Sequence, residues 1–260
     1  MNKKQSVIKM WDYRATEFAE ASIPNFSNDF TMKIIKQYAM CQPGCHVLDV
    51  GCGAGKYAIA LAKESFSVAA TDFSEKMLAE ATLCANQHNI TGIQFSFDDW
   101  SQVDIVKKGW YKSFDLVLCS MTPAVCDEQT IQKAIDACRG WLLITKPCRR
   151  TNSVIDKLNE LLGIDSTSGN ADEQLHLAFS TIWNTGEFPH LAYDYQVWTS
   201  NKTLEEAIPY YTTRLESNNI LTNEQKSVLC TYLTETAVNG VVKEDTRTTV
   251  TAIYCNFNNI

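Results

Sequence analysis

The sequence predicts an α/β protein built on a doubly wound, mostly parallel sheet of seven strands. Short apolar segments alternate with helical patterns from residue 46 to residue 147. These segments are apolar almost throughout, which is typical of strands in a parallel sheet covered on both faces. No tract rich in Pro, Gly or Ser separates parts of the chain. We therefore expect a single domain over residues 1–260, with a helical segment over 1–40, a core over 41–147 and an elaboration over 148–260.

In the first half of the chain, the spacing of apolar residues predicts the helices and strands. Apolar residues at helical spacing, and turns such as "CQPGC", set their limits. Helices are expected over residues 5–20, 27–40, 56–64, 75–88 and 127–138. Strands are expected over residues 46–50, 67–72, 93–97, 114–120 and 141–147.

After Pro147 the strand–helix rhythm breaks, and four more helices with two strands are expected. The strands are predicted by their β-branched and aromatic residues, and they cover residues 190–199 and 247–257. The helices are expected over residues 151–162, 171–184, 203–217 and 222–238. This part therefore forms a helical insertion after the fifth strand, followed by the last strands.

Composition excludes several classes of protein. The net charge of −7 argues against tight, charge-driven binding to nucleic acid. No apolar run approaches the roughly 18 residues of a membrane span. The basic start is not followed by an apolar core, so it does not resemble a secretory signal. A cytoplasmic protein without a membrane partner is expected, and its oligomeric state is not indicated.

The ten cysteines do not suggest a metal site. Zinc sites usually need two close pairs of ligands, whereas the chain has no Cys-x-x-Cys and only four histidines. Several cysteines lie inside apolar runs, as Cys119 and Cys138 do. We expect mainly buried, reduced thiols and no bound metal.

A glycine-rich turn follows the first strand, in "LDVGCGAGKYAIALA". Gly51, Gly53 and Gly55 allow a ligand to approach the backbone at the carboxyl end of a strand, where open α/β sheets bind their ligands. Their G-x-G-x-G spacing differs from the G-x-G-x-x-G of dinucleotide folds. Asp72 ends the next strand and is placed to accept hydrogen bonds from both hydroxyls of a ribose. Alternatively Asp72 caps the following helix, a role that Ser74 also suits.

Four stretches together resemble the motifs of class I S-adenosylmethionine-dependent methyltransferases: "LDVGCGAG", "ATDFSEKMLAEA", "IQFSFDDW" and "FDLVLCSM". The resemblance covers about residues 45–147. It implies the seven-stranded sheet of that family, S-adenosylmethionine as cofactor and S-adenosylhomocysteine as product. It also implies that the helical segment over 1–40 acts as a lid, because "MWDYRATEFAE" resembles the helix that precedes this core.

The resemblance also implies roles for individual residues in cofactor binding. Asp49 would lie near the ammonium of the methionine moiety, Asp72 would hold the ribose, and Arg14 would pair with the carboxylate. The other implied cofactor contacts are Trp11 in the lid, Gly51, Cys52, Gly53 and Gly55 in the loop, Phe73 and Met77 on the adenine, Asp99 or else Asp98 on its amino group, Trp100 beside the ring, and Cys119 and Ser120 at the methionine. For Trp11 and Arg14 the alternative is helix packing and a solvated charge.

The methyl acceptor is predicted to be a small molecule. The stretch "SMTPAVCD" lacks the Asn/Asp-Pro-Pro-Tyr of many enzymes that methylate the amino groups of nucleic-acid bases. Ser120, Met121 and Pro123 would form the floor of the acceptor pocket. The aromatic segment from Trp183 to Trp198 would form its roof, or else an ordinary apolar core.

Methyl transfer from a sulfonium requires mainly alignment and the exclusion of water, and a base only when the acceptor must lose a proton. His190 and Tyr193 are the candidate bases, and the catalytic residue is otherwise unassigned. A methyltransferase acting on RNA or protein is an alternative, with "KPCRR" (146–150) as its compact basic run. A non-catalytic protein that binds the cofactor is a further alternative. The glycine spacing opposes a nicotinamide-dependent oxidoreductase.

Overall fold

The computed structural model describes residues 3–19, 22–165, 169–217 and 219–258. The chain divides into two compact units. The larger unit comprises Trp11–Lys146, Asp172–Asp194 and Thr251–Ile260, and the smaller unit comprises Met1–Met10, Pro147–Ala171 and Tyr195–Val250. The expectation of one domain with an elaboration stays a prediction.

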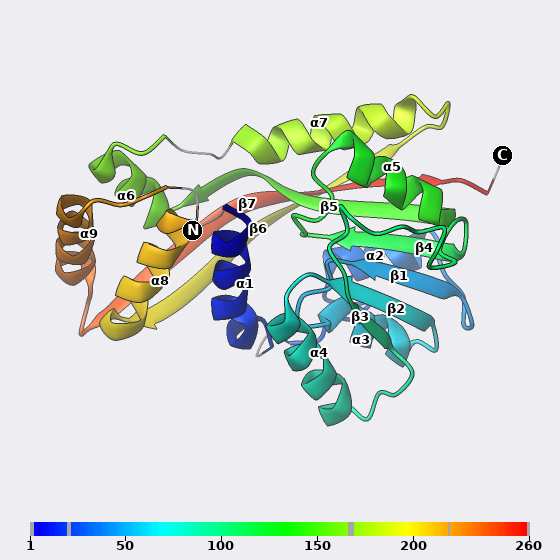
Figure 1. Ribbon diagram of the computed structural model, residues 1–260, viewed down its shortest axis with the longest axis horizontal. Helices are drawn as coiled ribbons and strands as arrows, with labels where there is room; N and C mark the ends of the chain where they lie inside the picture. The colour runs from blue at the N-terminus through cyan, green and yellow to red at the C-terminus, as the bar shows by residue number, and fades with distance from the viewer. Residues whose placement is uncertain (1–2, 20–21, 166–168, 218, 259–260) are drawn as a thin grey trace. The chain divides into compact units, whose positions relative to one another are not determined.

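The strands form one sheet in the order β3-β2-β1-β4-β5-β7-β6 (Figure 1). They are β1 (His46–Val50), β2 (Ser67–Asp72), β3 (Gln94–Phe97), β4 (Phe114–Ser120), β5 (Cys138–Asn152), β6 (His190–Thr203) and β7 (Val241–Asn256). The pairings β1–β2, β1–β4, β2–β3 and β4–β5 are all parallel. The predicted α/β fold with a seven-stranded sheet, parallel over its first five strands, is therefore confirmed.

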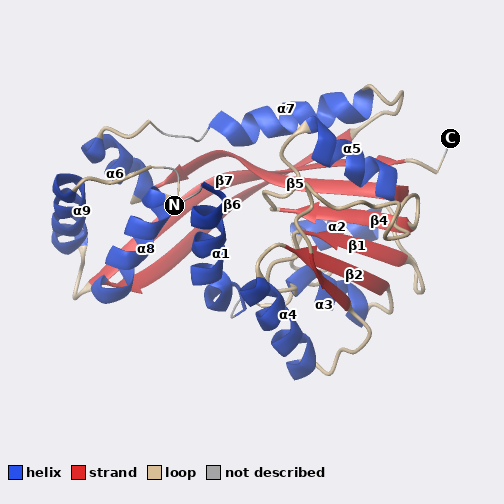
Figure 2. Cartoon of the chain, viewed as in Figure 1, coloured by secondary structure: helices blue, strands red, loops and turns tan. Residues whose placement is uncertain are grey.

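Helices connect these strands in the alternation that the sequence predicts (Figure 2). They are α1 (Lys3–Ala19), α2 (Phe30–Gln37), α3 (Lys56–Lys63), α4 (Glu75–Gln87), α5 (Glu128–Ala137), α6 (Ile155–Leu162), α7 (Gly169–Trp183), α8 (Leu204–Glu216) and α9 (Asn223–Thr236). Side chains cap several of them: Asp127 accepts from the Thr130 amide at α5, and Ser74 accepts from the Met77 amide at α4.

The largest difference from the predicted limits concerns the long strands. Strand β5 runs on to Asn152, although Pro147 marks the predicted end, and β7 begins at Val241 rather than at residue 247. Proline removes one backbone donor, which a central strand tolerates poorly, but its fixed φ is compatible with an extended chain. Pro147 lies beyond Thr145, the last β5 residue that pairs with β4, so the strand continues where no donor to β4 is needed.

Each unit has its own apolar core. In the larger unit, Val47 and Leu116 from the central strands pack with Leu61 of α3 and Met32 of α2. In the smaller unit, helices α6, α8 and α9 contribute Leu158, Tyr211 and Leu229 to a separate cluster. There the buried Tyr211 hydroxyl donates to Glu244 Oε2 at 2.7 Å, which satisfies a polar group inside that core.

All ten cysteines lie in the described ranges and none of them forms a disulfide bond; Cys119 and Cys138 are buried as expected, whereas Cys126 is exposed. Within the described ranges no cluster of His, Cys, Asp or Glu side chains has the makings of a metal site. None of the helices in the described part of the chain combines the length and the apolar character that a membrane crossing requires.

Candidate functional site

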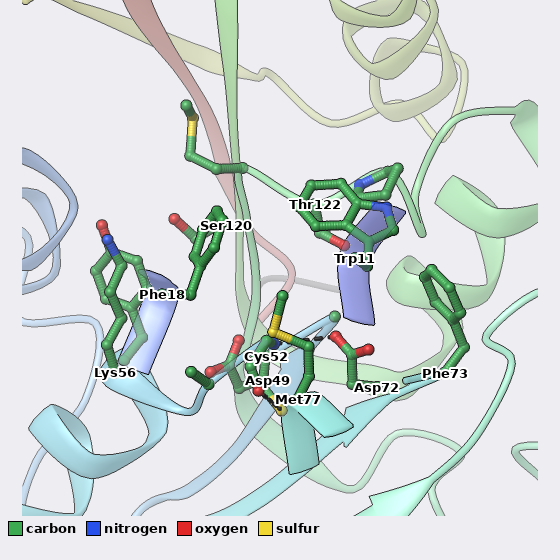
Figure 3. A pocket seen from close by; sticks show the side chains of 16 residues that line it. Trp11, Phe18, Asp49, Cys52, Lys56, Asp72, Phe73, Met77, Ser120 and Thr122 are labelled. Carbon is green, nitrogen blue, oxygen red and sulfur yellow. Dashed lines mark hydrogen bonds between the residues drawn. The ribbon is translucent and has the colours of Figure 1, made fainter. Parts of the chain in front are cut away.

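A pocket opens in the larger unit at the carboxyl ends of β1, β2 and β4 (Figure 3). It encloses about 690 Å³ of space, its open mouth included. Its lining comprises Trp11, Phe18, Asp49, Gly51, Cys52, Gly53, Ala54, Lys56, Tyr57, Asp72, Phe73, Met77, Ser120, Met121, Thr122 and Pro123. Eleven of the sequence-predicted site residues thus meet around one cavity: all of these except Phe18, Ala54, Lys56, Tyr57 and Thr122.

Two of the glycines are required by packing. Gly51 has φ +68°, and a Cβ there would lie 1.9 Å from Thr122 Oγ1 in the loop after β4. Gly55 has φ +78°, and its Cβ would lie 2.8 Å from Ala81 Cβ in α4. Gly55 is the residue before α3 and does not line the pocket. Its role in the structure is therefore close packing of α3 on α4, in contrast to Gly51 at the pocket wall.

Asp49 brings a buried carboxyl group to the pocket. Its side chain is only 2% exposed, and Oδ2 has no hydrogen-bond partner among the described residues. Burial, with a smaller contribution from the nearby Asp72 carboxylate, raises the pKa of Asp49 to about 7. Such a group is stabilised by a cation or a hydrogen-bond donor, so its surroundings favour a positively charged ligand group.

Replacing Asp49 with asparagine is expected to stabilise the ligand-free protein above pH 7. The folded-state pKa of about 7 exceeds the ordinary value of about 3.9. Folding therefore favours the protonated group, and stability is lost as pH rises from about 4 through 7. Asparagine cannot ionise, so Asp49→Asn should gain about 2–4 kcal/mol at pH 8 and little at pH 4. Thermal unfolding at both pH values measures this, and an equal difference at the two would contradict it.

Asp72 ends β2 and holds the glycine loop. Its Oδ2 accepts from the Gly53 amide at 3.0 Å, and its Oδ1 accepts from the Ser74 amide at 2.9 Å. Burial raises its pKa, although these two bonds and one from Phe73 oppose the shift. A carboxylate has about four acceptor sites, so acceptor capacity remains for a ligand. Ser74 is the residue that caps α4, and Asp72 is free of that role.

Helix α1 contributes apolar side chains to the pocket. Trp11 and Phe18 line it, while Ala15 packs with Ala54 and Met77. The Arg14 guanidinium lies over the rings of Trp11 and Phe18, 5.5 and 4.7 Å from their centroids, and is not part of the lining. The Trp11 Nε1 atom is buried and has no hydrogen-bond partner in the described structure.

The loop after β4 forms a further part of the pocket wall and packs directly against Gly51. Met121 has φ +54°, a conformation that few non-glycine residues adopt. Its amide donates to the Thr145 carbonyl at 2.9 Å, and the buried Lys146 Nζ donates to the Thr122 carbonyl. Burial lowers the pKa of Lys146 to about 8. These bonds hold Met121, Thr122 and Pro123 at the pocket.

The residues of the third motif, Asp98, Asp99 and Trp100, are not part of the pocket lining. Asp98 Oδ2 accepts from Thr71, Ser96 and Lys108, and these donors lower its pKa despite the opposing effect of burial. Asp99 Oδ1 accepts from the Ser101 amide at 3.0 Å. Trp100 is buried, and its Nε1 donates to the Thr130 carbonyl at 3.0 Å. Asp98, Asp99 and Trp100 do not line the cavity, and neither does the fully buried Cys119.

The predicted aromatic roof also lies elsewhere. Of residues 183–194, all of them described, none lines the pocket. Trp183 and Tyr193 are 52% and 63% exposed, and the His190 ring stacks on Tyr254 at 5.3 Å. The reason is topological: β6 is the edge strand, and β7 and β5 separate it from β4. His190 and Tyr193 thus lack the position that a base at this pocket needs.

Sequence reasoning missed polar residues of α3 and the loop after β4. Lys56 and Tyr57 directly follow Gly55, and this position next to the glycine turn could have indicated that they line the pocket. The Tyr57 hydroxyl donates to Asp29 Oδ2 at 3.1 Å, and its oxygen lies 3.3 Å from Thr31 Oγ1. Burial, then the Asp29 charge, raises its pKa, so the phenol stays neutral. Nothing in the sequence distinguishes Phe18, Ala54 and Thr122 from residues with an ordinary packing role.

Comparison with known proteins identifies a methyltransferase family and a related protein. A family described as a methyltransferase domain matches residues 42–208. A protein of Geobacillus sp. (strain WCH70), named as a methyltransferase, is 35% identical over 106 residues; the match spans 40% of this chain and 40% of that protein.

Two solved structures share the fold. The phosphoethanolamine N-methyltransferase 2 of Haemonchus contortus aligns with TM-score 0.55 and 14% identity, over 98% of this chain and 60% of that one. A methyltransferase of Bacillus halodurans C-125 aligns with TM-score 0.53 and 17% identity, over 86% and 97%. Since the family match covers more than half of the sequence and the sheet order agrees, the chain belongs to the class I S-adenosylmethionine-dependent methyltransferases.

Proposed function

We propose that the protein transfers a methyl group from S-adenosylmethionine to a small-molecule acceptor. The observation that carries this proposal is the pair of buried carboxyl groups, Asp49 and Asp72, which face one pocket from neighbouring strands (Figure 3). The cofactor offers an ammonium and a ribose diol. The Asp49 Oδ2 atom lacks a partner among the described residues, and Asp72 has acceptor capacity left, so the residues present fit this group.

The lining suggests which residues would hold each part of the cofactor. Asp49 would bind the ammonium, Asp72 the ribose hydroxyls, and Phe73 with Met77 the apolar faces of the adenine. Lys56 suits the carboxylate better than Arg14, because Lys56 lines the pocket while the Arg14 guanidinium lies on two aromatic rings. When bound, the cofactor supplies a methyl group on a sulfonium.

The protein's own contribution would be orientation, exclusion of water and, where needed, a path for a proton. Met121 and Pro123 would exclude water at the acceptor side. The methyl acceptor would donate a hydrogen bond to the Tyr57 oxygen, while the Tyr57 hydroxyl donates to Asp29. A proton leaving the acceptor would pass to the Tyr57 oxygen as the Tyr57 proton moves to the half-buried Asp29. Tyr57 and Asp29 would thus provide the base that the sequence assigned to His190 or Tyr193.

Charge supports a small acceptor over RNA or protein. The basic run over 146–150 does not present a continuous surface, because Lys146 is only 4% exposed and bonded to the Thr122 carbonyl. The net charge of −7 also disfavours a polyanion. The Haemonchus enzyme that shares the fold is described with phosphomonomethylethanolamine, a small molecule.

S-adenosylhomocysteine is expected to raise the unfolding temperature, and NAD is not. A ligand at 100 times its Kd stabilises the folded state by about 2.7 kcal/mol. The NAD pyrophosphate would meet the Asp49 and Asp72 carboxylates, which repel it. Differential scanning fluorimetry with each ligand measures the shift. Stabilisation by NAD, with none by S-adenosylhomocysteine, would reject the proposal.

Tritium transfer then separates the alternatives for the acceptor. The protein and tritiated S-adenosylmethionine are incubated with a small-molecule extract, with RNA and with denatured protein. Label that appears only in the small-molecule extract supports the proposal. Label in RNA or protein favours a macromolecular acceptor. Cofactor binding without any transfer favours the non-catalytic alternative.

A further inference from the structure

A hydrogen bond to Asp12 connects helix α1 to the turn that follows Asp72. Asp12 Oδ1 accepts this hydrogen bond from the Ser74 hydroxyl at 2.7 Å, although the two residues are 62 positions apart in the sequence. Trp11, Ala15 and Phe18 of the same helix make apolar contacts with Ala54 and Met77. Apolar packing is not directional, whereas a hydrogen bond to a carboxylate fixes one position of the helix.

Ser74 connects three parts of the pocket at once. Its amide donates to Asp72 Oδ1, its oxygen accepts from the Met77 amide to cap α4, and its hydroxyl proton goes to Asp12. The Ser74 side chain is fully buried, and its bonds to Asp72 and Met77 are buried too, whereas the bond to Asp12 is partly buried. A hydroxyl has one donor, and Asp12 takes it. The position of α1 is thereby tied to the carboxylate on the pocket wall.

A second observation concerns Trp11, the residue before Asp12. Its ring lines the pocket, and its Nε1 donor is buried with no acceptor among the described residues. Figure 3 shows Trp11 on the same side of the pocket as Asp72 and Phe73. A buried donor without an acceptor disfavours the closed position of α1. The bond between Asp12 and Ser74 offsets this, and a ligand that brings an acceptor to Trp11 would add to it.

We propose that Asp12 is a positioning residue that holds α1 closed over the ligand through Ser74, so that closure of this helix and ligand binding are coupled. The inference rests on the proposed function for the identity of the ligand. Loss of the bond lowers the fraction of molecules with α1 in place, and apparent affinity falls in proportion to that fraction. Asp12 itself need not touch the ligand.

The test compares three variants by calorimetry with S-adenosylhomocysteine. Asp12→Ala should weaken binding about tenfold, because the directional bond is lost. Asp12→Asn should bind nearly as the unmodified protein does, because its amide oxygen still accepts from Ser74. Ser74→Asp keeps a good helix cap but sets two carboxylates against each other, so it should bind as weakly as Asp12→Ala. Lys9→Ala, an exposed change in the same helix, is the matched control.

Amide hydrogen exchange of residues 11–15 in the ligand-free protein gives a readout that does not depend on the ligand. Asp12→Ala should exchange faster there, while the exchange of β1 and β2 stays unchanged. If the unmodified protein does not bind S-adenosylhomocysteine, the proposed function fails, and exchange alone decides the role of Asp12. Equal affinity and equal exchange in Asp12→Ala would overturn the inference. Failure of Asp12→Asn to restore binding would overturn it too, because charge and not the hydrogen bond would then be responsible.

Discussion

Replacing Asp72 with alanine is expected to weaken binding of S-adenosylhomocysteine by at least about tenfold and up to roughly a hundredfold. Hydrogen bonds to a charged group contribute about 1.5–3 kcal/mol each, and each 1.4 kcal/mol changes affinity about tenfold. The loss of one such bond to a ribose hydroxyl accounts for this range. Isothermal titration calorimetry with S-adenosylhomocysteine measures the change.

The matched control is Asp115→Ala, at the opposite end of the parallel strands. Asp115 Oδ2 accepts from the His46 amide at 2.9 Å, and its carboxylate pairs with Arg139. That variant also leaves a backbone donor without its acceptor, yet it is remote from the pocket, so its affinity should not change. Unchanged affinity in Asp72→Ala would show that Asp72 serves only the loop, through the Gly53 and Ser74 amides.

Replacing Gly51 with alanine is expected to lower the unfolding temperature by about 10 °C. A Cβ at this position would lie 1.9 Å from Thr122 Oγ1 and 2.7 Å from Thr122 Cβ, and φ is +68°. Overpacking costs about 1–3 kcal/mol, and a left-handed backbone costs an alanine about 1–2 kcal/mol. Each kcal/mol shifts the unfolding temperature of a chain of this size by about 2–4 °C. Thermal unfolding followed by circular dichroism measures it.

Gly44→Ala separates the two causes. Gly44 has φ +90°, but no atom lies within 4 Å of its added Cβ, so this variant carries backbone strain alone. Gly51→Ala should therefore be the less stable of the two. Equal unfolding temperatures would mean that the loop after β4 moves aside at little cost, and that Lys146 and Thr145 do not hold it.

Strand positions were predictable because their signals are local. The apolar runs at 46–50, 67–72 and 114–120 have the same limits as β1, β2 and β4. In a doubly wound sheet the carboxyl ends of such strands share one edge. This rule is enough to bring Asp49, Asp72 and Ser120 to one pocket, where the structure has them.

Side-chain direction was not predictable in the same way. Asp98 and Asp99 follow β3 as the third motif requires, yet Lys108, Ser96 and Ser101 occupy their oxygens. The aromatic segment from Trp183 to Trp198, which contains His190 and Tyr193, is expected from the sequence to cover the acceptor pocket. The order of β5, β7 and β6 in the sheet decides that question, and it keeps both residues from the pocket lining.

The strands and the glycine loop could be predicted from the sequence, and four short motifs were enough to indicate the family, because each of these signals lies within a short stretch of chain. Which further polar groups reach the pocket depends on the tertiary structure. The bond from Ser74 to Asp12 and the placement of Lys56 instead of Arg14 at the pocket depend on the packing of α1 against α4 and the glycine loop. Such contacts join residues far apart in the chain, and the local pattern around either partner does not encode them.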